Sequence, residues 1–118
     1  VTDYYSGGDL FTKIVSRKGL SERHAKKLTK GVLNGLTHIH KSGCVHRDVK
    51  AENVLLTGEG MPVLADFGIA CSLTDGDLFQ ACGTPGYVAP EILEGKPCST
   101  AVDVFGVGVL LHFAICVQ

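Results

Sequence analysis

Apolar residues recur with helical spacing in the first third of the chain. Leu10, Phe11, Ile14 and Val15 follow a Gly-Gly pair, and Gly19 interrupts the pattern, which predicts a short helix after a turn. A longer stripe begins after Ser21, a favourable N-cap, and ends near residues 42–43; its members are Ala25, Leu28, Val32, Leu33, Leu36 and Ile39. We therefore expect a second, long helix with one buried face.

Short apolar runs and turn residues dominate the middle of the chain. Residues 54–56 and 63–65 are separated by a Gly-containing turn at 57–60 and predict a β-hairpin. Residues 69–88 are loop-like, and Pro90 begins a short turn of helix. The pattern is thus that of an α+β fold, mainly helical, with one small hairpin.

The C-terminal part is almost wholly apolar. Thr100 and Asp103 have the spacing of a loose capping box, and a buried helix is expected to follow to residue 117, surrounded by protein on most sides. The run from 104 to 117 is too short to span a bilayer and contains His112, so no membrane partner is expected.

Charge and cysteine content narrow the class of protein. The 118 residues are 45% hydrophobic with a formal net charge of -1, which excludes a disordered chain and, with no continuous basic run, predicts no nucleic-acid partner. The five cysteines are odd in number, scattered and without a C-x-x-C pair. This favours neither a disulfide framework nor a zinc site and predicts a cytoplasmic protein, with the nucleus left open.

One polar loop carries the candidate chemistry. The stretch VHRDVKAENVLL (45–56) places Asp48, Lys50 and Asn53 just before the first hairpin strand, and Asp66 follows the second. A hairpin brings its two flanking loops together, and carboxylate and amide oxygens are the ligands that Mg²⁺ prefers. Carboxylates that hold magnesium beside a lysine are suited to phosphoryl transfer.

Three motifs give this constellation a family resemblance. H-R-D-V-K-A-E-N (46–53), D-F-G (66–68) and G-T-P-G-Y-V-A-P-E (83–91) resemble, in order and spacing, the catalytic loop, magnesium loop and activation-segment end of a protein kinase. Lys50 and G-T-P-G-Y resemble serine/threonine kinases. The stretches YYSGGDLFTKIV, ACGTPGYVAPEIL and GKPCSTAVD look most like the calmodulin-dependent kinase group.

The resemblance implies roles for individual residues. Asp48 is the implied catalytic base, Lys50 contacts the transferred phosphate, and Thr84 braces both. Asn53 and Asp66 are the implied metal ligands. The implied cofactor-binding set, for ATP with Mg²⁺, is Asp3, Tyr5, Asp9, Lys50, Glu52, Asn53, Leu55 and Asp66.

Within that set, the hinge and its neighbours have more specific expectations. Backbone groups of Asp3 and Tyr5 face adenine, with Thr2 as gatekeeper, and Leu55 packs under the ring. Asp9 lies near the ribose or a basic substrate residue. For Glu52, a contact to a basic substrate residue and an exposed loop position remain alternatives. For Asp103, the resemblance implies hydrogen bonds to the backbone of the catalytic loop, and a capping role is the alternative; both roles are structural.

The resemblance also implies which parts of a kinase domain residues 1–118 contain. It implies a partial kinase domain at 1–118, with the hinge at about 1–8, a large-lobe part at 9–118 and no small lobe, because the glycine-rich loop and strand lysine are missing from these residues. Implied partners are protein substrates with Ser or Thr, with basic residues nearby as an option. A calmodulin-type regulator fits the group, but no residue here indicates one.

The resemblance also gives expectations for regulation and for the choice of acceptor residue. Arg47 usually meets an activation-loop phosphate in the family, and Gln80 stands at the usual phosphosite, so activation without phosphorylation is expected, with Asp75 or Asp77 as a source of charge. Ile69, β-branched after D-F-G, implies a preference for threonine.

A pseudokinase or truncated interaction module, and less so a small-molecule kinase, remain the alternative functions.

Overall fold

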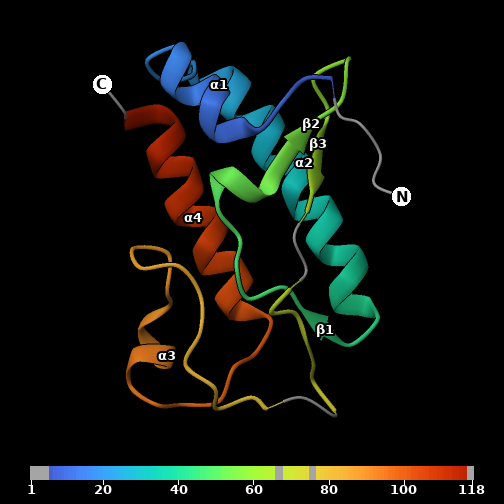
Figure 1. Ribbon diagram of the computed structural model, residues 1–118, viewed down its shortest axis with the longest axis vertical. Coiled ribbons are helices and arrows are strands. Elements are labelled where there is room, and N and C mark those ends of the chain that lie inside the picture. Colours follow the sequence, from blue (N-terminus) through green and yellow to red (C-terminus); the bar gives the residue numbers. More distant parts are fainter. Residues whose placement is uncertain (1–5, 66–67, 75–76, 117–118) are drawn as a thin grey trace.

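The computed structural model describes residues 6–65, 68–74 and 77–116. Three helices of seven or more residues and two small antiparallel sheets make up this part (Figure 1). The elements are, in chain order, α1 (Leu10–Ser16), α2 (Glu22–Lys41), β1 (Cys44–Val45), η1 (Ala51–Asn53), β2 (Val54–Leu56), β3 (Pro62–Leu64), β4 (Cys71–Ser72), α3 (Pro90–Leu93) and α4 (Ala101–Cys116). The predicted α+β class, mainly helical with a small hairpin, is confirmed.

The two N-terminal helices form where the apolar spacing predicted them. Ser21 caps α2, because its hydroxyl oxygen accepts a hydrogen bond from the backbone N–H of His24 at 3.2 Å. Asp9 caps α1 in the same way by accepting from Thr12 N–H at 2.8 Å, and it also accepts from the Thr12 hydroxyl at 2.9 Å. This second cap was not predicted from the sequence.

The hairpin β2–β3 begins one residue earlier on its second strand than predicted. Thr57 N–H donates to Met61 C=O and closes the turn, so Pro62 pairs with Leu56 and Val63 with Leu55. Ala65 lies outside β3, although its N–H still donates to the Asn53 carbonyl. The hairpin therefore places residue 53 and the end of β3 side by side.

A second sheet, β1–β4, was missed by the sequence reading. Cys44 pairs with Ser72 and Val45 with Cys71, so each strand has only two residues. Two residues are too few for an alternating pattern to be recognised. This sheet ties the segment after the D-F-G motif to the entrance of the polar loop.

The core lies between α2, α4, α1 and the hairpin. Buried side chains of all these elements form one cluster that includes Leu10, Ile14, Leu28, Leu36, Val54, Leu56 and Leu110. Residues 7–9 run beside β2, since Gly7 N–H donates to Leu56 C=O and Leu56 N–H donates to Gly8 C=O. The polar loop is thus built on a packed scaffold.

The structure decides between the two roles expected for Asp103 of α4. Asp103 does not complete a capping box with Thr100; its carboxylate turns inward and binds groups of α2 and the polar loop. One side of the helix is buried, while Val104, Phe105 and Ile115 are exposed among the described residues. Burial of this helix on most sides was expected for a complete large lobe and stays a prediction. Within the described ranges, no helix has the length and apolar character to cross a membrane.

Candidate active site

The polar loop between β1 and β2 is held from behind by a buried carboxylate. Asp103 of α4, only 1% exposed, accepts hydrogen bonds from the backbone N–H groups of His46 and Arg47, each at 2.8 Å. His40 of α2 approaches the same carboxylate through Nε2 at 2.7 Å. Arg47 has a left-handed φ of 69°, a strained conformation for a side chain of this size, which these bonds stabilise.

His46 fixes the loop from inside the core. Its Nε2 lies 2.8 Å from the Ala65 carbonyl and its Nδ1 lies 3.1 Å from the Asp48 N–H. A carbonyl can only accept and an N–H can only donate, so the ring is assigned as the neutral tautomer with its proton on Nε2. The ring thereby joins the hairpin end to the backbone of Asp48.

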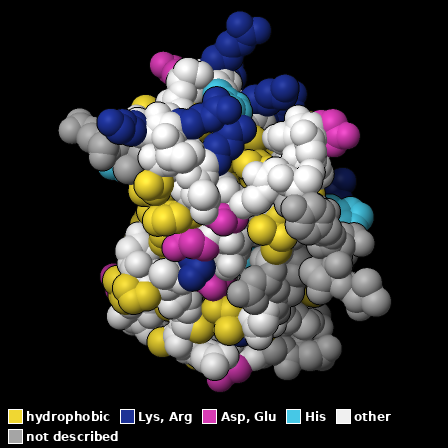
Figure 2. All heavy atoms as spheres, turned by 45° about the horizontal axis from the view of Figure 1, so that its top comes forward, with side chains coloured by type: hydrophobic (Ala, Val, Ile, Leu, Met, Phe, Trp, Pro, Cys, Tyr) yellow, Lys and Arg dark blue, Asp and Glu magenta, His cyan; other side chains and the backbone are white. Residues whose placement is uncertain are grey.

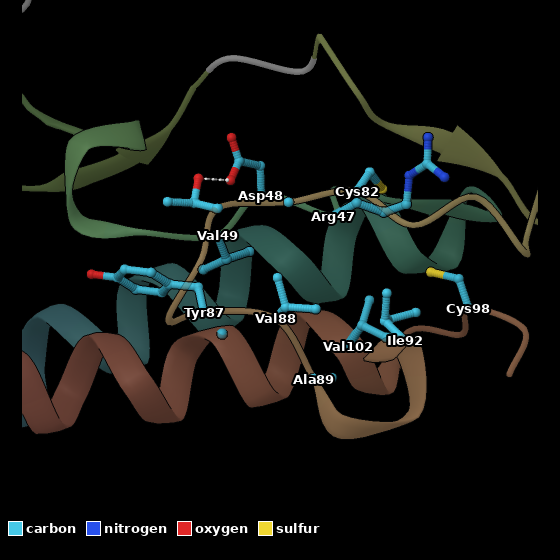
Figure 3. A pocket seen from close by; sticks show the side chains of 13 residues that line it. Arg47, Asp48, Val49, Cys82, Tyr87, Val88, Ala89, Ile92, Cys98 and Val102 are labelled. Carbon is cyan, nitrogen blue, oxygen red and sulfur yellow. Dashed lines mark hydrogen bonds between the residues drawn. The ribbon is translucent and has the colours of Figure 1, made fainter. Parts of the chain in front are cut away.

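Four side chains from two separate segments converge beyond this point. The Thr84 hydroxyl donates to Asp48 Oδ1 at 2.7 Å and accepts from Lys50 Nζ at 2.7 Å; Figure 3 draws the Asp48 bond as a dashed line. Lys50 Nζ is 3.8 Å from Asp48 Oδ2, and Asn53 Nδ2 donates to the same oxygen at 3.2 Å. The arrangement holds a carboxylate and an ammonium group at a fixed separation.

Asn53 is suited to hold a metal ion from one side. Its Nδ2 is taken up by Asp48, through the backbone carbonyl at 2.8 Å and the carboxylate, which leaves Oδ1 as the group able to ligate a cation. An amide oxygen is a hard ligand that fits Mg²⁺. No group of three or more His, Cys, Asp or Glu side chains in the described ranges is placed to hold a metal, and Asp66 lies outside those ranges.

The remaining predicted site residues lie in different surroundings, and some lie outside the described residues. Leu55 is half-buried in β2 and forms a bridge with Asp9, so the two lie side by side. Both carboxylate oxygens of Asp9 are engaged in capping α1. Glu52 is exposed in η1, while Asp3 and Tyr5 lie outside the described residues, like Asp66 and the predicted gatekeeper at position 2. Their contacts to a nucleotide stay predictions.

Arg47 connects the polar loop to the segment after the D-F-G motif. Its Nε donates to the Ile69 carbonyl at 2.6 Å, Nη1 to the Asp77 carbonyl at 3.2 Å and Nη2 to Gln80 Oε1 at 3.4 Å. The Asp77 carboxylate instead accepts from the backbone N–H of Phe79. The expectation that Asp77 supplies charge to Arg47 is therefore wrong: its backbone carbonyl makes the contact. Asp75 lies outside the described residues.

A small cavity separates the loop from α4 (Figure 3). Its volume of about 20 Å³ is enough for one water molecule and far too small for a nucleotide. Cys98 lines it, and burial raises the pKa of this thiol to about 11. Gly106 lies on the same wall, where an added Cβ would meet the Val49 carbonyl oxygen at 3.0 Å. The sequence alone does not separate this glycine from Gly108 of the same helix, where an added Cβ would meet nothing within 4 Å.

Comparisons with known proteins agree with this geometry. The family model described as a protein kinase domain matches residues 1–118. The chain is 40% identical to calcium/calmodulin-dependent protein kinase type 1 of Caenorhabditis elegans and 41% identical to a probable myosin light chain kinase of Dictyostelium discoideum, over 98% of the chain in each case. It spans only 34% and 31% of these two relatives.

The family model matches the whole chain, and both relatives are at least 40% identical to it in sequence over 98% of its length. Together these findings establish the family. The H-R-D, D-F-G and A-P-E motifs stand in the order that the family requires, and Thr84, from the segment that ends in A-P-E, binds Asp48 of H-R-D. The chain therefore belongs to the protein kinase domain family and resembles the calcium/calmodulin-dependent kinases within it.

Proposed function

We propose that the protein transfers the γ-phosphoryl group of ATP to serine or threonine hydroxyls of protein substrates. The observation that carries this proposal is the Thr84 hydroxyl, which bridges Asp48 and Lys50 with two hydrogen bonds of 2.7 Å. A carboxylate and an ammonium group held at a fixed separation suit a reaction in which a hydroxyl attacks a phosphate. The family membership supports the same class of reaction.

Asp48 is placed to receive the proton of the acceptor hydroxyl. Oδ1 is bound by Thr84 and Oδ2 by Asn53, so the carboxylate cannot rotate freely. A fixed carboxylate orients a substrate O–H and accepts its proton as the O–P bond forms. Lys50 contributes a positive charge within 4 Å of Asp48, where negative charge on the transferred phosphoryl group would be stabilised.

Asn53 and Asp66 would hold the magnesium ion. Magnesium, when bound, neutralises phosphate charge and orients the phosphates. The contribution of this chain is to keep Asn53 Oδ1 available, which it does by binding the amide nitrogen to Asp48. Asp9, Leu55, Glu52 and the hinge residues stay proposed nucleotide or substrate contacts.

The activation segment is proposed to work without a phosphate. Arg47 binds two backbone carbonyls and the neutral amide of Gln80, so its guanidinium already has acceptors from residues 69, 77 and 80. Serine versus threonine choice is proposed to follow Ile69, whose β-branched side chain suits threonine. We propose a reducing compartment such as the cytosol, because the five cysteines are scattered in the sequence and form no C-x-x-C pair.

Phosphate transfer by the full-length protein tests the function. The protein is incubated with labelled ATP and paired peptides that differ only in Ser or Thr, with Mg²⁺ and then with a chelator. We expect transfer that requires Mg²⁺ and is faster to threonine. Nucleotide binding without transfer would instead assign the protein as a pseudokinase, and equal rates on both peptides would remove only the threonine preference.

A further inference from the structure

Positive charge is concentrated at one end of this chain. Residues 13–30 contain seven of its 11 Lys and Arg residues and one acidic residue, so this segment carries a formal charge of +6. The rest of the chain, with four basic and eleven acidic residues, carries -7. The sequence has no continuous basic run, but the fold collects the cations: Figure 2 shows dark blue Lys and Arg side chains around a cyan His at the top of the molecule.

The centre of this surface is His24 of α2. Lys13 of α1 lies across from it, with Nζ 3.4 Å from His24 Nε2. Both side chains are half-buried. Burial, together with the neighbouring charges of Lys13, Arg17 and Lys27, lowers the pKa of His24, and burial and Arg17 lower that of Lys13. These groups therefore destabilise one another's charged forms.

In the described part of the chain, no ion pair joins Lys13, Arg17 or His24 to an acidic side chain, and Glu22 is the one acidic residue of residues 13–30. The described ion pairs involve Asp103, Asp48 and Glu94, none of which belongs to this surface. Asp9, one helical turn before Lys13, uses its carboxylate to cap α1. A simply solvated charged face would not include a half-buried lysine bound to a histidine, because burying an unpaired charge is unfavourable.

The surface is also hollowed beside these groups. An open depression of about 450 Å³ is lined by Arg17, Gly19, Leu20, Ser21 and His24. The Ser21 hydroxyl oxygen accepts from His24 N–H, which leaves its own proton to donate. A guanidinium, an imidazole and a hydroxyl thus line an open space with room for a tetrahedral oxyanion and part of the chain that carries it, and Lys13 contacts His24 beside it.

We propose that the surface formed by Lys13, Arg17, Ser21, His24 and Lys27 is a docking site for a phosphorylated side chain of a protein substrate or partner. A compact dianion meets only the positive end of the molecule, whereas a long nucleic acid would also meet the remainder of charge -7. The concave shape suits a single phosphoryl group better than a flat membrane surface. The choice of a protein as carrier rests on the proposed kinase function; the anion site itself does not.

Histidine NMR of the full-length protein tests this site without requiring catalysis. The spectra are recorded without ATP, and two probes are added: sulfate, and a phosphoserine flanked by glycines. We expect both to shift the His24 signals and to raise its pKa, because a bound anion favours the imidazolium form. The unphosphorylated peptide should leave the signals unchanged.

Matched variants separate this site from general charge effects. Arg17→Gln, at an exposed position, and K13Q/R17Q should weaken phosphoserine binding by about tenfold or more, as expected for loss of a charged hydrogen bond. Lys41→Gln makes the same single charge change as Arg17→Gln at the other end of α2 and should leave phosphoserine affinity within about twofold.

Three outcomes would overturn the proposal. The first is no response of His24 to either probe, and the second is equal phosphoserine affinity of K13Q/R17Q and the unmodified protein. The third is a response to a short RNA or to anionic phosphatidylserine vesicles without a response to the phosphoserine peptide. Asp48→Asn should bind the peptide normally. Absence of phosphate transfer by the unmodified protein, together with intact anion binding, would therefore contradict the kinase proposal and not this one.

Discussion

At the scale of single residues, the site depends on one hydroxyl and one buried carboxylate. The Thr84 hydroxyl holds the Asp48 and Lys50 side chains at a fixed separation. The Asp103 carboxylate binds the backbone of the polar loop. The first comes from the activation-segment end and the second from α4. Residues far apart in sequence thus determine the position of the proposed base.

Replacing the Thr84 hydroxyl tests the first of these contacts. Thr84→Ala should lower kcat by about tenfold or more, since Asp48 and Lys50 both lose a hydrogen bond that orients them. Thr84→Ser keeps the hydroxyl and should stay within about threefold. Steady-state peptide phosphorylation measures both, and equal activity of the two variants would show that the hydroxyl is not required.

Asp103→Asn tests the second contact through stability. The amide retains one acceptor oxygen but no charge, and it presents an NH₂ group toward backbone donors, so we expect a loss of about 2–3 kcal/mol in the free energy of unfolding. Urea denaturation measures the loss. Glu94→Gln removes an exposed carboxylate paired with Lys96 and should change stability by less than about 0.5 kcal/mol. Comparable losses in both variants would contradict the role of Asp103.

Cys98 offers a chemical test of burial beside the loop. Its pKa is raised to about 11 by burial, so almost none of the thiol is the reactive thiolate at pH 8. Iodoacetamide should therefore modify Cys98 much more slowly than the exposed Cys116. Mass spectrometry of timed samples gives both rates, and rapid labelling of Cys98 in the folded protein would show that it is accessible.

At the scale of elements, α4 is shaped by two glycines with opposite surroundings. An added Cβ at Gly106 would meet the Val49 carbonyl oxygen at 3.0 Å, whereas nothing lies within 4 Å of one at Gly108. In a helix interior each glycine is less favourable than alanine by roughly 1 kcal/mol. Only Gly106 has a packing reason to be glycine, because it lets α4 approach the polar loop.

The two alanine substitutions should therefore have opposite signs. Gly108→Ala should raise the free energy of unfolding by about 0.5–1 kcal/mol, since helix propensity improves without a clash. Gly106→Ala should lower it and also lower activity, because the loop that carries Asp48 must shift. Thermal melts and peptide phosphorylation of the pair test this, and stabilisation by both would mean that α4 does not pack closely on the loop.

At the scale of the whole molecule, the individual helices and the hairpin could be predicted from the sequence, but most contacts between separate elements could not. Helical spacing located α1, α2 and α4 to within a few residues, and family motifs identified the polar loop. The pairing of β1 with β4 could not be predicted, because two-residue strands leave no pattern. The inward turn of the Asp103 carboxylate was expected from the family resemblance, while local spacing alone favoured a cap. Its bond to His40 and the gathering of cations around His24 depend on contacts between separate helices.

The exposed side of α4 leads to an expectation for residues 1–118 produced alone. Val104 is 54% exposed and Phe105 40%, and Leu33, Leu111 and Ile115 line an open apolar groove between α2 and α4. These 118 residues also contain no glycine-rich loop to hold nucleotide phosphates. We expect this chain to be poorly soluble and inactive. Expression, a thermal melt and a peptide assay test it; a soluble, cooperatively folded and active chain would contradict it.

Phosphate transfer by Asp48→Asn in the full-length protein tests the central claim most directly. Asparagine keeps the shape and most hydrogen bonds of Asp48 but cannot accept the acceptor proton, so kcat should fall by about 100-fold or more with nucleotide affinity nearly unchanged. Glu59→Gln, an exposed acid in the β2–β3 turn, is the matched control and should keep full activity. Transfer at the unmodified rate by Asp48→Asn would contradict the assignment of Asp48 as the catalytic base and, with it, the proposed active site.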